Sequence, residues 1–200
     1  MTESYWLEPI TQNHPRLHGE HGCDVVVIGG GLCGTSAAYH LAQAGVRVIL
    51  LEARTLSESA SGRNAGFLLQ GTAERYSRAI EVMGHDRAKR IHSWSLENHR
   101  MMAEVLDRER IECAYQKRGS LQLAGTPEEE AELLESARLL NADGFLAERL
   151  DRHQLAPALQ NAGFQMGVLL PEDGELQPAR FVRGVGDSAA TQGAGVFERS

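Results

Sequence analysis

From residue 23 onwards, apolar and small residues recur in a regular pattern along the chain. Two apolar runs, Val25 to Ile28 and Val46 to Leu51, flank an alanine-rich stretch from Thr35 to Ala44 that has helical spacing. A glycine-rich turn separates the first run from this stretch, and Gly45 ends it. Short apolar runs bounded by turn residues are typical of buried strands. The pattern therefore predicts a strand, a helix and a second strand in βαβ order.

The same reading predicts alternating helices and strands in the rest of the chain. Gly84 separates two amphipathic stretches, and Thr126 followed by Pro127 is a typical helix start with an N-cap residue and a proline in the first turn. Pro157 is expected to end a short helix, because proline removes a backbone donor. We expect helices at 72–83, 86–109, 127–140, 151–156 and 179–191, strands at 113–116, 119–124, 166–170 and 195–198, and a turn at 171–174.

Composition and charge narrow the classes of protein that the sequence fits. A chain of 200 residues with 42% hydrophobic and 24% charged residues is typical of a soluble globular protein. Its formal net charge of −7 argues against a nucleic-acid partner, because phosphate-binding surfaces need clustered lysine and arginine. No apolar run approaches the length of about 20 residues that crosses a bilayer. Three scattered cysteines and a polar N-terminus without a signal-peptide core predict a cytoplasmic protein.

Residues 1–22 are expected to form an irregular arm, because Pro9 and Pro15 interrupt any helix. The apolar group at residues 5–7 is expected to pin this arm to the surface. Three histidines in the arm have suggestive spacing, but Pro15 and Gly19 prevent a rigid set of metal ligands. We therefore expect a solvated arm and no metal site at these histidines, which are His14, His18 and His21.

The glycine turn after the first strand has the spacing G-x-G-x-x-G. Gly29 permits the tight turn, Gly31 leaves room for a diphosphate against the backbone, and Gly34 lets the helix pack closely on the sheet. The helix N-terminus then offers free N–H groups to phosphate. The second run ends on Glu52, about 20 residues after the turn, where an acid that binds ribose hydroxyls is expected and a 2′-phosphate is disfavoured. An ordinary βαβ unit without a ligand stays open as the alternative.

A second motif lies in the long loop of residues 53–71, which follows Glu52 directly. Its central part, residues 59–67, is rich in serine, alanine and glycine, so its backbone can pass close to a flat or bulky group. Arg63 and Asn64 add a planar cation and an amide, which suit phosphate and the polar edge of a ring. The loop therefore favours a flavin over a nicotinamide cofactor. A flexible surface loop is the alternative interpretation.

Taken together, the glycine turn, its acid and the motif at residues 61–66 resemble the D-amino-acid-oxidase-like family of FAD-dependent oxidoreductases, which includes glycine oxidase and sarcosine oxidase. The Ser-Gly-Arg-Asn-Ala-Gly form of the loop and the Ser-Tyr-Trp-Leu arm are most similar to the gamma-glutamylputrescine oxidase branch. The similarity continues through residues 119–121 and 174–178 and so covers most of the chain.

This resemblance implies non-covalent FAD, because the loop at 59–67 contains no histidine or cysteine for a covalent link. It implies that the three glycines line the diphosphate, that Glu52 holds the adenosine ribose, and that the later loop passes along the diphosphate and the flavin edge. No metal site is implied. The full set of expected cofactor-binding residues is Gly29, Gly31, Leu32, Cys33, Gly34, Glu52, Ala53, Arg54, Ser61, Gly62, Arg63, Asn64, Ala65, Gly66 and Phe67.

The resemblance also implies an α/β fold, with a Rossmann-like FAD-binding domain of the GR2 type and part of a β-rich substrate-domain insert. Family members are much longer than this chain, so we expect it to correspond to an N-terminal fragment, truncated at the C-terminus. The expected divisions are an arm at 1–22, an FAD-binding core at 23–112, the partial insert at 113–176 and a return to the FAD-binding domain at 177–200.

The function implied for the intact family enzyme is oxidation of a C–N bond in an amine or amino acid, with hydride transfer to the flavin. The partner is then a small-molecule substrate, and no catalytic residue can be assigned within the chain. Tyr115 and Arg118 lie near the insert, but structural or solvated roles are favoured for both. Two alternatives remain open, a non-catalytic nucleotide-binding fragment and an NAD-dependent dehydrogenase. The sequence indicates neither the amine, the electron acceptor nor the oligomeric state.

Overall fold

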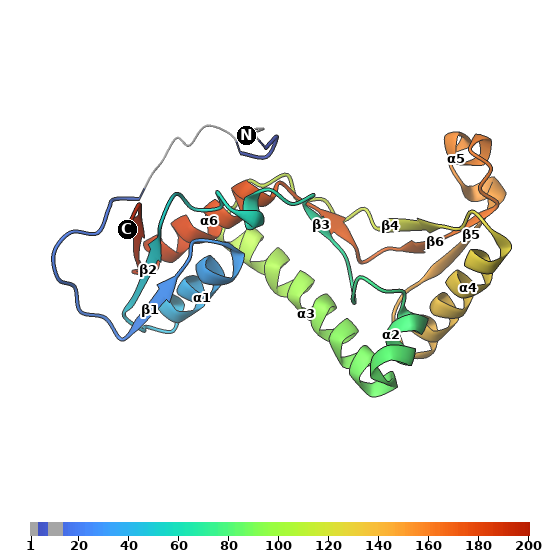
Figure 1. Cartoon of the computed structure of the whole chain (residues 1–200), viewed down its shortest axis with the longest axis horizontal. Coiled ribbons are helices and arrows are strands. Elements are labelled where there is room, and N and C mark those ends of the chain that lie inside the picture. The colour runs from blue at the N-terminus through green and yellow to red at the C-terminus, as the bar shows by residue number, and fades with distance from the viewer. Residues whose placement is uncertain (1–3, 8–13) are drawn as a thin grey trace. The chain divides into compact units, whose positions relative to one another are not determined.

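The computed structural model describes residues 4–7 and 14–200, which fall into two units (Figure 1). Within this described part, the first unit contains residues 4–7, 14–66, 105–115 and 176–200. The second unit contains residues 67–104 and 116–175. Helix α3, His85–Glu109, belongs to both units, because its residues from Val105 onwards join the first. The units divide the chain differently from the sequence prediction, which assigned residues 67–104 to the FAD-binding core.

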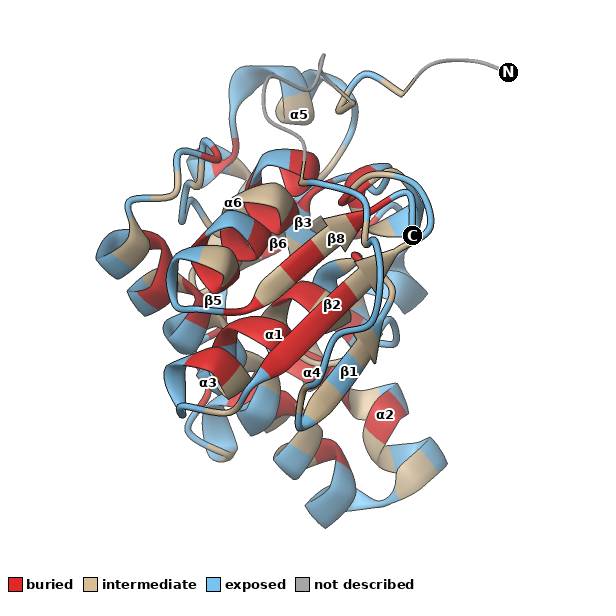
Figure 2. Ribbon diagram, turned by 90° about the vertical axis from the view of Figure 1, so that its left-hand side faces the viewer, coloured by how far each residue is buried: buried red, intermediate tan, exposed pale blue. Residues whose placement is uncertain are grey.

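A parallel three-stranded sheet forms the centre of the first unit, with strands in the order β1, β2, β8 (Figure 2). The middle strand is buried, with Val48 at 2% and Leu50 at 0% exposure. On β1, an edge strand of the described sheet, Val26 is 51% and Ile28 86% exposed, so the face of the strand that these two side chains share is uncovered. The three strands span Val25–Ile28 (β1), Val48–Glu52 (β2) and Gly195–Glu198 (β8).

Two helices, α1 (Leu32–Gln43) and α6 (Pro178–Thr191), pack against each other and against this sheet. The small and apolar residues of α1 allow the close packing, and Ala38 and Tyr39 are fully buried. Gly45 ends the helix in the left-handed region, at φ +78°, a conformation that favours glycine. The expected strand–helix–strand order is confirmed by this arrangement.

The second unit contains an antiparallel sheet with strands in the order β4, β6, β5. Helix α4 packs on β6, and α2 packs on α4. A two-stranded pair, β3 with β7, completes the sheets of the described residues. The elements span Phe67–Leu68 (β3), Tyr76–Met83 (α2), Ser120–Leu123 (β4), Pro127–Ala142 (α4), Glu148–Asp151 (β5), Pro157–Asn161 (α5), Met166–Leu170 (β6) and Gly174–Glu175 (β7). Short 3-10 helices lie at Arg152–Gln154 and, in the first unit, at Ala60–Gly62.

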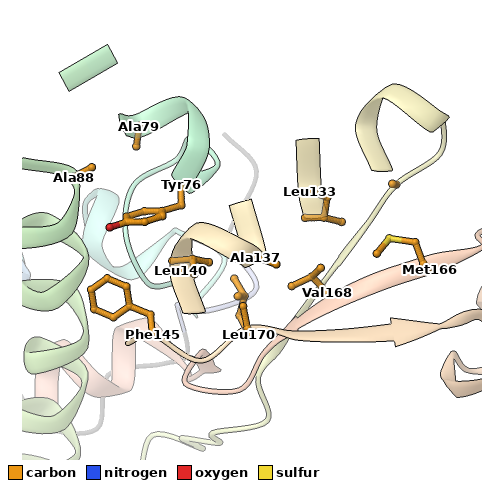
Figure 3. Close-up of a cluster of buried hydrophobic side chains, with 12 residues drawn as sticks. Tyr76, Ala79, Ala88, Leu133, Ala137, Leu140, Phe145, Met166, Val168 and Leu170 are labelled. Carbon is orange, nitrogen blue, oxygen red and sulfur yellow. The ribbon is translucent and has the colours of Figure 1, made fainter. Parts of the chain in front are cut away.

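The core of the second unit forms where helices α2, α3 and α4 meet strand β6. Figure 3 shows its aromatic and aliphatic side chains between helix and sheet. Burying these side chains is the main stabilising contribution, at roughly 25 cal/mol per Å² of apolar surface. Members of this cluster include Tyr76, Leu133, Leu140, Phe145, Met166, Val168 and Leu170.

Asp143, just after α4, ties three helices of the second unit together. Its carboxylate accepts hydrogen bonds from the Tyr76 hydroxyl at 2.6 Å, from His85 Nε2 at 2.7 Å and from Lys89 Nζ at 3.0 Å. Burial opposes the charge, but these hydrogen bonds outweigh it and lower the pKa of Asp143 to about 2. The carboxylate therefore stays ionised and fixes the ends of α2, α3 and α4.

Most predicted elements are confirmed, including the strand at 166–170, the helix from Pro127 with Thr126 as its N-cap, and the last helix and strand. The helix expected at 72–83 begins only at Tyr76. The strand expected at 113–116 is wrong, because only an isolated bridge from Gln116 to Glu175 forms there. The helix expected at 151–156 is also wrong, since a strand and a 3-10 turn precede a helix that Pro157 begins.

The described part of the N-terminal arm lies against the first unit. Gln177 donates to the Trp6 carbonyl at 2.8 Å, and the Glu198 amide donates to the Pro15 carbonyl at 3.0 Å. Residues 1–3 and 8–13, which include Pro9, lie outside the described residues. Among the residues that are described, no group of histidine, cysteine and acidic side chains has a metal-binding arrangement. None of the described helices combines the length and the apolar character that crossing a membrane requires.

Candidate cofactor site

The glycine turn connects β1 to α1 with the geometry that its spacing predicts. Gly29 lies at φ +104°, a region that favours glycine, and its amide donates to the Leu51 carbonyl at 2.8 Å. A Cβ at Gly34 would lie 1.9 Å from the Gly29 carbonyl oxygen, so only glycine fits there. The first strand, the turn and the helix are therefore held in close contact by two positions without side chains.

At the N-terminus of α1, the N-cap residue has no side chain that could cap the helix. Gly31 is the N-cap residue, and the first turn of the helix contains no acidic residue. The amides of a first helical turn have no acceptor within the helix and carry the positive end of its dipole. Leu32 and Cys33 are exposed at this end. Together these features make the turn an acceptable site for a phosphate group.

Glu52 lies at the carboxyl end of β2, at the mouth of the same turn. One carboxylate oxygen accepts from the Gly30 amide at 2.6 Å, and the other accepts from the Arg54 amide at 2.8 Å. A Cβ at Gly30 would lie 3.0 Å from the Glu52 Cβ, so the acid approaches the turn closely. The structure thus brings the expected ribose-binding acid beside the expected diphosphate-binding turn.

The loop after β2 folds back over the start of α1. The Ser61 hydroxyl accepts from the Leu32 amide at 3.0 Å, and a Cβ at Gly31 would lie 2.9 Å from the same oxygen. Arg54 donates to the Ser59 hydroxyl, and Arg63 Nε donates to the Glu58 carbonyl at 2.7 Å. A Cβ at Gly62 would lie 2.1 Å from the Ser57 carbonyl oxygen, so this approach also requires glycine.

The remaining predicted residues differ in their exposure and contacts. Ala53 and Ala65 are exposed with the two arginines of the loop. Asn64 is exposed as well, but its amide makes hydrogen bonds within the loop. Gly66 is buried at φ +75°, where a Cβ would lie 2.1 Å from the Leu176 carbonyl oxygen. Phe67 begins β3 of the second unit and is 63% exposed.

Two supporting residues are absent from the sequence prediction. Glu198, only 2% exposed, accepts from the Leu56 amide at 2.7 Å and from the His14 amide at 3.2 Å. The Ser57 amide donates to the Gly30 carbonyl at 3.0 Å, and Ser57 itself lies at φ +68°. Glu198 comes from the far end of the chain, so no local sequence signal could associate it with the turn. For Ser57, the signal in the sequence was Gly62, a glycine that permits close packing against it.

These residues fit a dinucleotide with a diphosphate and an adenosine ribose. The turn offers bare main chain and first-turn amides to the diphosphate, and no Cβ intrudes at Gly29, Gly31 or Gly34. Glu52 supplies a carboxylate at the end of the second strand. Arg54 and Arg63 place cations on the exposed side of the loop.

The comparison with protein families agrees with this geometry. The family described as DAO: FAD dependent oxidoreductase matches residues 24–200, which is nearly the whole described chain. The chain belongs to this DAO family. The resemblance inferred from the glycine turn and the loop motif is therefore confirmed, and so is the α/β fold class that it implied.

Two curated relatives match all or most of the chain. Gamma-glutamylputrescine oxidoreductase of Escherichia coli (strain K12) is 32% identical over 206 residues, covering 100% of this chain and 47% of that protein. Glycine oxidase of Bacillus licheniformis is 29% identical over 186 residues, covering 88% of this chain and 45% of that protein. The chain thus spans about half the length of the curated relatives that it matches.

The crystal structure of glycine oxidase from Geobacillus kaustophilus resembles this DAO-family chain with a TM-score of 0.74. The two sequences are 22% identical, and the match covers 88% of this chain and 46% of that one. At this level of identity the comparison shows a shared fold. The assignment of individual residues to the cofactor therefore depends on the geometry above.

The second unit of the DAO-family chain has a separate group of buried polar side chains beside a cavity of about 510 Å³. Asp173, 1% exposed, accepts from the Gln70 amide at 2.8 Å and from the Ser120 hydroxyl at 2.5 Å, and burial raises its pKa. His92 lies 3.0 Å from the Gln70 side-chain oxygen, and burial lowers its pKa to about 4. These contacts connect α3, β4 and the loop before α2 into one buried polar group.

Proposed function

We propose that the protein binds FAD non-covalently through its first unit. In this proposal the diphosphate rests on the main chain of residues 29–34, and Glu52 accepts hydrogen bonds from the adenosine ribose. The observation that carries the proposal is the position of the Glu52 carboxylate, 2.6 Å from the Gly30 amide, beside a helix N-terminus whose N-cap residue has no side chain. Membership of the DAO family of FAD-dependent oxidoreductases supports the identity of the cofactor.

The loop residues have two different roles in this proposal. Ser61, Gly62 and Gly66 allow the backbone to pass close to the cofactor, while Arg54 and Arg63 offset the negative charge of the diphosphate. Glu52 also decides between dinucleotides, because its carboxylate repels the 2′-phosphate of NADP.

We further propose that the whole protein oxidises a C–N bond of a small amine or amino acid in the cytoplasm. The names of two relatives, gamma-glutamylputrescine oxidoreductase and glycine oxidase, support this substrate class. A flavin supplies the redox chemistry when bound, since it accepts a hydride from the carbon next to nitrogen. The residues of this chain hold and orient the cofactor, and none of them is assigned as a catalytic acid or base.

The visible absorption spectrum of the chain after incubation with FAD and removal of free FAD tests the proposal. We expect protein-bound flavin that acid precipitation releases intact, because the binding is non-covalent. Glu52→Gln should weaken FAD binding at least about tenfold, since a charge-assisted hydrogen bond is lost. The matched control is Glu81→Gln, an exposed glutamate of α2 in the second unit, which should retain wild-type affinity.

Three results would separate the alternatives. A chain that binds NADH selectively and retains no flavin contradicts the proposal and supports a dehydrogenase. Bound FAD without turnover of any amine supports a nucleotide-binding protein without catalytic activity. Amine-dependent bleaching of the bound flavin under anaerobic conditions supports the proposed oxidation.

A further inference from the structure

The start of α1 takes its cap from a distant loop. Its own N-cap residue, Gly31, has no side chain, and the Leu32 amide instead donates to the Ser61 hydroxyl at 3.0 Å. A serine hydroxyl in this position satisfies one of the free amides of a helix N-terminus. The 3-10 helix at 60–62 therefore acts as an external cap for α1, and its position decides which amides of the turn remain free.

Asn64 holds Ser61 in that position. Its side-chain nitrogen donates to the Ser61 carbonyl at 2.8 Å and to the Ala60 carbonyl at 3.3 Å. Its side-chain oxygen accepts from the Gly66 amide at 2.9 Å. An asparagine amide offers two donor hydrogens, and both are directed at carbonyls of the loop. The amide is thus engaged within the loop on both its donor and its acceptor side.

Both ends of this loop are fixed to the rest of the first unit. At one end, the Gly62 Cα lies so close to Ser57 that a Cβ would be 2.1 Å from its carbonyl oxygen. At the other end, the Gly66 carbonyl accepts from the Leu176 amide at 2.9 Å. The hydrogen bonds of Asn64 span the segment between these anchors. Losing them would free Ser61 to move while the two anchors stayed in place.

We propose that Asn64 is a positioning residue for the cofactor site. It positions Ser61 so that the serine hydroxyl accepts a hydrogen bond from the Leu32 amide. The amides of Cys33 and Gly34 then remain available to the diphosphate. Asn64 then acts through Ser61. Its amide does not contact the flavin directly, in contrast to the role that its residue type suggested. The part of this proposal that concerns FAD rests on the proposed function, whereas the coupling of Asn64 to α1 does not.

Two readouts on the full chain test this proposal. The first is hydrogen exchange of the Leu32 and Gly66 amides without any cofactor, and the second is the affinity for FAD. Asn64→Ala should speed exchange of both amides and weaken FAD binding about five- to tenfold, the effect of losing a typical hydrogen bond. Asn98→Ala, an exposed asparagine on α3, is the matched control and should change neither.

Variants at the two positions give a stricter test of the coupling. Ser61→Ala should speed exchange of Leu32 as Asn64→Ala does, and combining the two should add little, because they act through one contact. Ser61→Thr keeps the hydroxyl and should restore protection of Leu32. Asn64→Asp keeps the acceptor for Gly66 but lacks the donors, so it should protect Gly66 and leave Leu32 unprotected.

Unchanged exchange at Leu32 in Asn64→Ala would overturn the proposal. If FAD binding is nevertheless weaker in that variant, Asn64 is a direct cofactor contact. If Asn64→Ala speeds exchange at Leu32 but the wild-type chain binds no FAD, the coupling stands and the proposed function fails.

Discussion

Two glycines of the cofactor turn differ in what an added methyl group would meet. At Gly34 the Cβ would lie 1.9 Å from the Gly29 carbonyl oxygen, a backbone atom that cannot move aside. At Gly31 it would lie 2.9 Å from the Ser61 hydroxyl oxygen, the end of a side chain that can rotate. The backbone at Gly31, at φ −86° and ψ −174°, also suits alanine.

We therefore expect opposite defects from the two alanine substitutions. Gly34→Ala should destabilise the chain by about 3 kcal/mol or more, because of the backbone clash. Gly31→Ala should change stability by less than about 1 kcal/mol and weaken FAD binding at least about tenfold, since the methyl group blocks the diphosphate. Thermal unfolding and a binding titration measure the two effects. A Gly31→Ala chain with unchanged FAD affinity would contradict the assignment of the turn.

The cysteines provide a test within a single molecule. Cys33 is exposed in the first turn of α1, whereas Cys113 is 1% exposed and burial raises the pKa of its thiol. Because the thiolate is the reactive form, iodoacetamide should label Cys33 long before Cys113. FAD at saturating concentration should slow labelling of Cys33 severalfold and leave Cys113 unaffected. Mass spectrometry of the peptides measures both rates, and equal labelling of Cys33 with and without FAD would argue against a cofactor at this helix end.

At the residue scale, the sequence predicts the positions whose role depends on spacing along the chain. Gly29, Gly31, Gly34 and Glu52 have such roles, and the structure brings them together as their spacing implies. Glu198 is different, because its carboxylate reaches Leu56 from 142 positions farther along the sequence. The direction of a side-chain amide is also invisible in a sequence. From the sequence, the Asn64 amide suited phosphate or the edge of the ring, and in the structure its hydrogen bonds are made within the loop.

At the element scale, α3 contains a histidine that links its stability to pH. His92 is 4% exposed, and its pKa falls from an ordinary value of 6.5 to about 4 because of burial. As the pH falls below 6.5, the unfolded chain takes up this proton before the folded chain does. The contribution of neutral His92 is therefore complete above pH 6.5 and is lost between pH 6.5 and 4, by on the order of 2 kcal/mol.

Denaturant unfolding at several pH values measures this effect. His92→Gln should remove most of the stability change between pH 6.5 and 4, even if it lowers stability at neutral pH. The control is His40→Gln, on the exposed side of α1, which should keep the pH dependence of the wild-type chain. A His92→Gln chain with the same pH dependence as wild type would show that His92 is not buried in its neutral form.

Elements with a clear periodic signal were predicted well, and those with competing signals were not. The βαβ unit has two apolar runs, and the strand at Met166–Leu170 is an apolar run before a turn. The strand Glu148–Asp151 reads Glu-Arg-Leu-Asp, which shows little apolar character because it is a largely exposed edge strand. Pro157 marked a helix boundary correctly but at the wrong end, because proline both ends helices and begins them.

At the scale of the whole molecule, the chain contains a parallel α/β unit and an antiparallel unit, and segments of the two units alternate along the sequence. Composition and local pattern could not predict that residues 67–104 join the second unit, because this depends on which core the helices pack against. One face of β1, which carries the exposed side chains of Val26 and Ile28, also differs from what its apolar sequence predicts. A run such as Val-Val-Val-Ile is typical of a parallel strand covered on both faces.

The central claim, that a diphosphate rests on the main chain at residues 29–34 beside Glu52, is tested most directly by amide chemical shifts. In a titration of the isotopically labelled chain with ADP and then with FAD, both ligands should shift the amides of Gly31, Cys33, Gly34 and Arg54. FAD should shift the amides of the loop at 61–66 further than ADP does, because ADP has the diphosphate but lacks the flavin. Shifts that leave residues 29–34 unchanged at saturating FAD would contradict the claim.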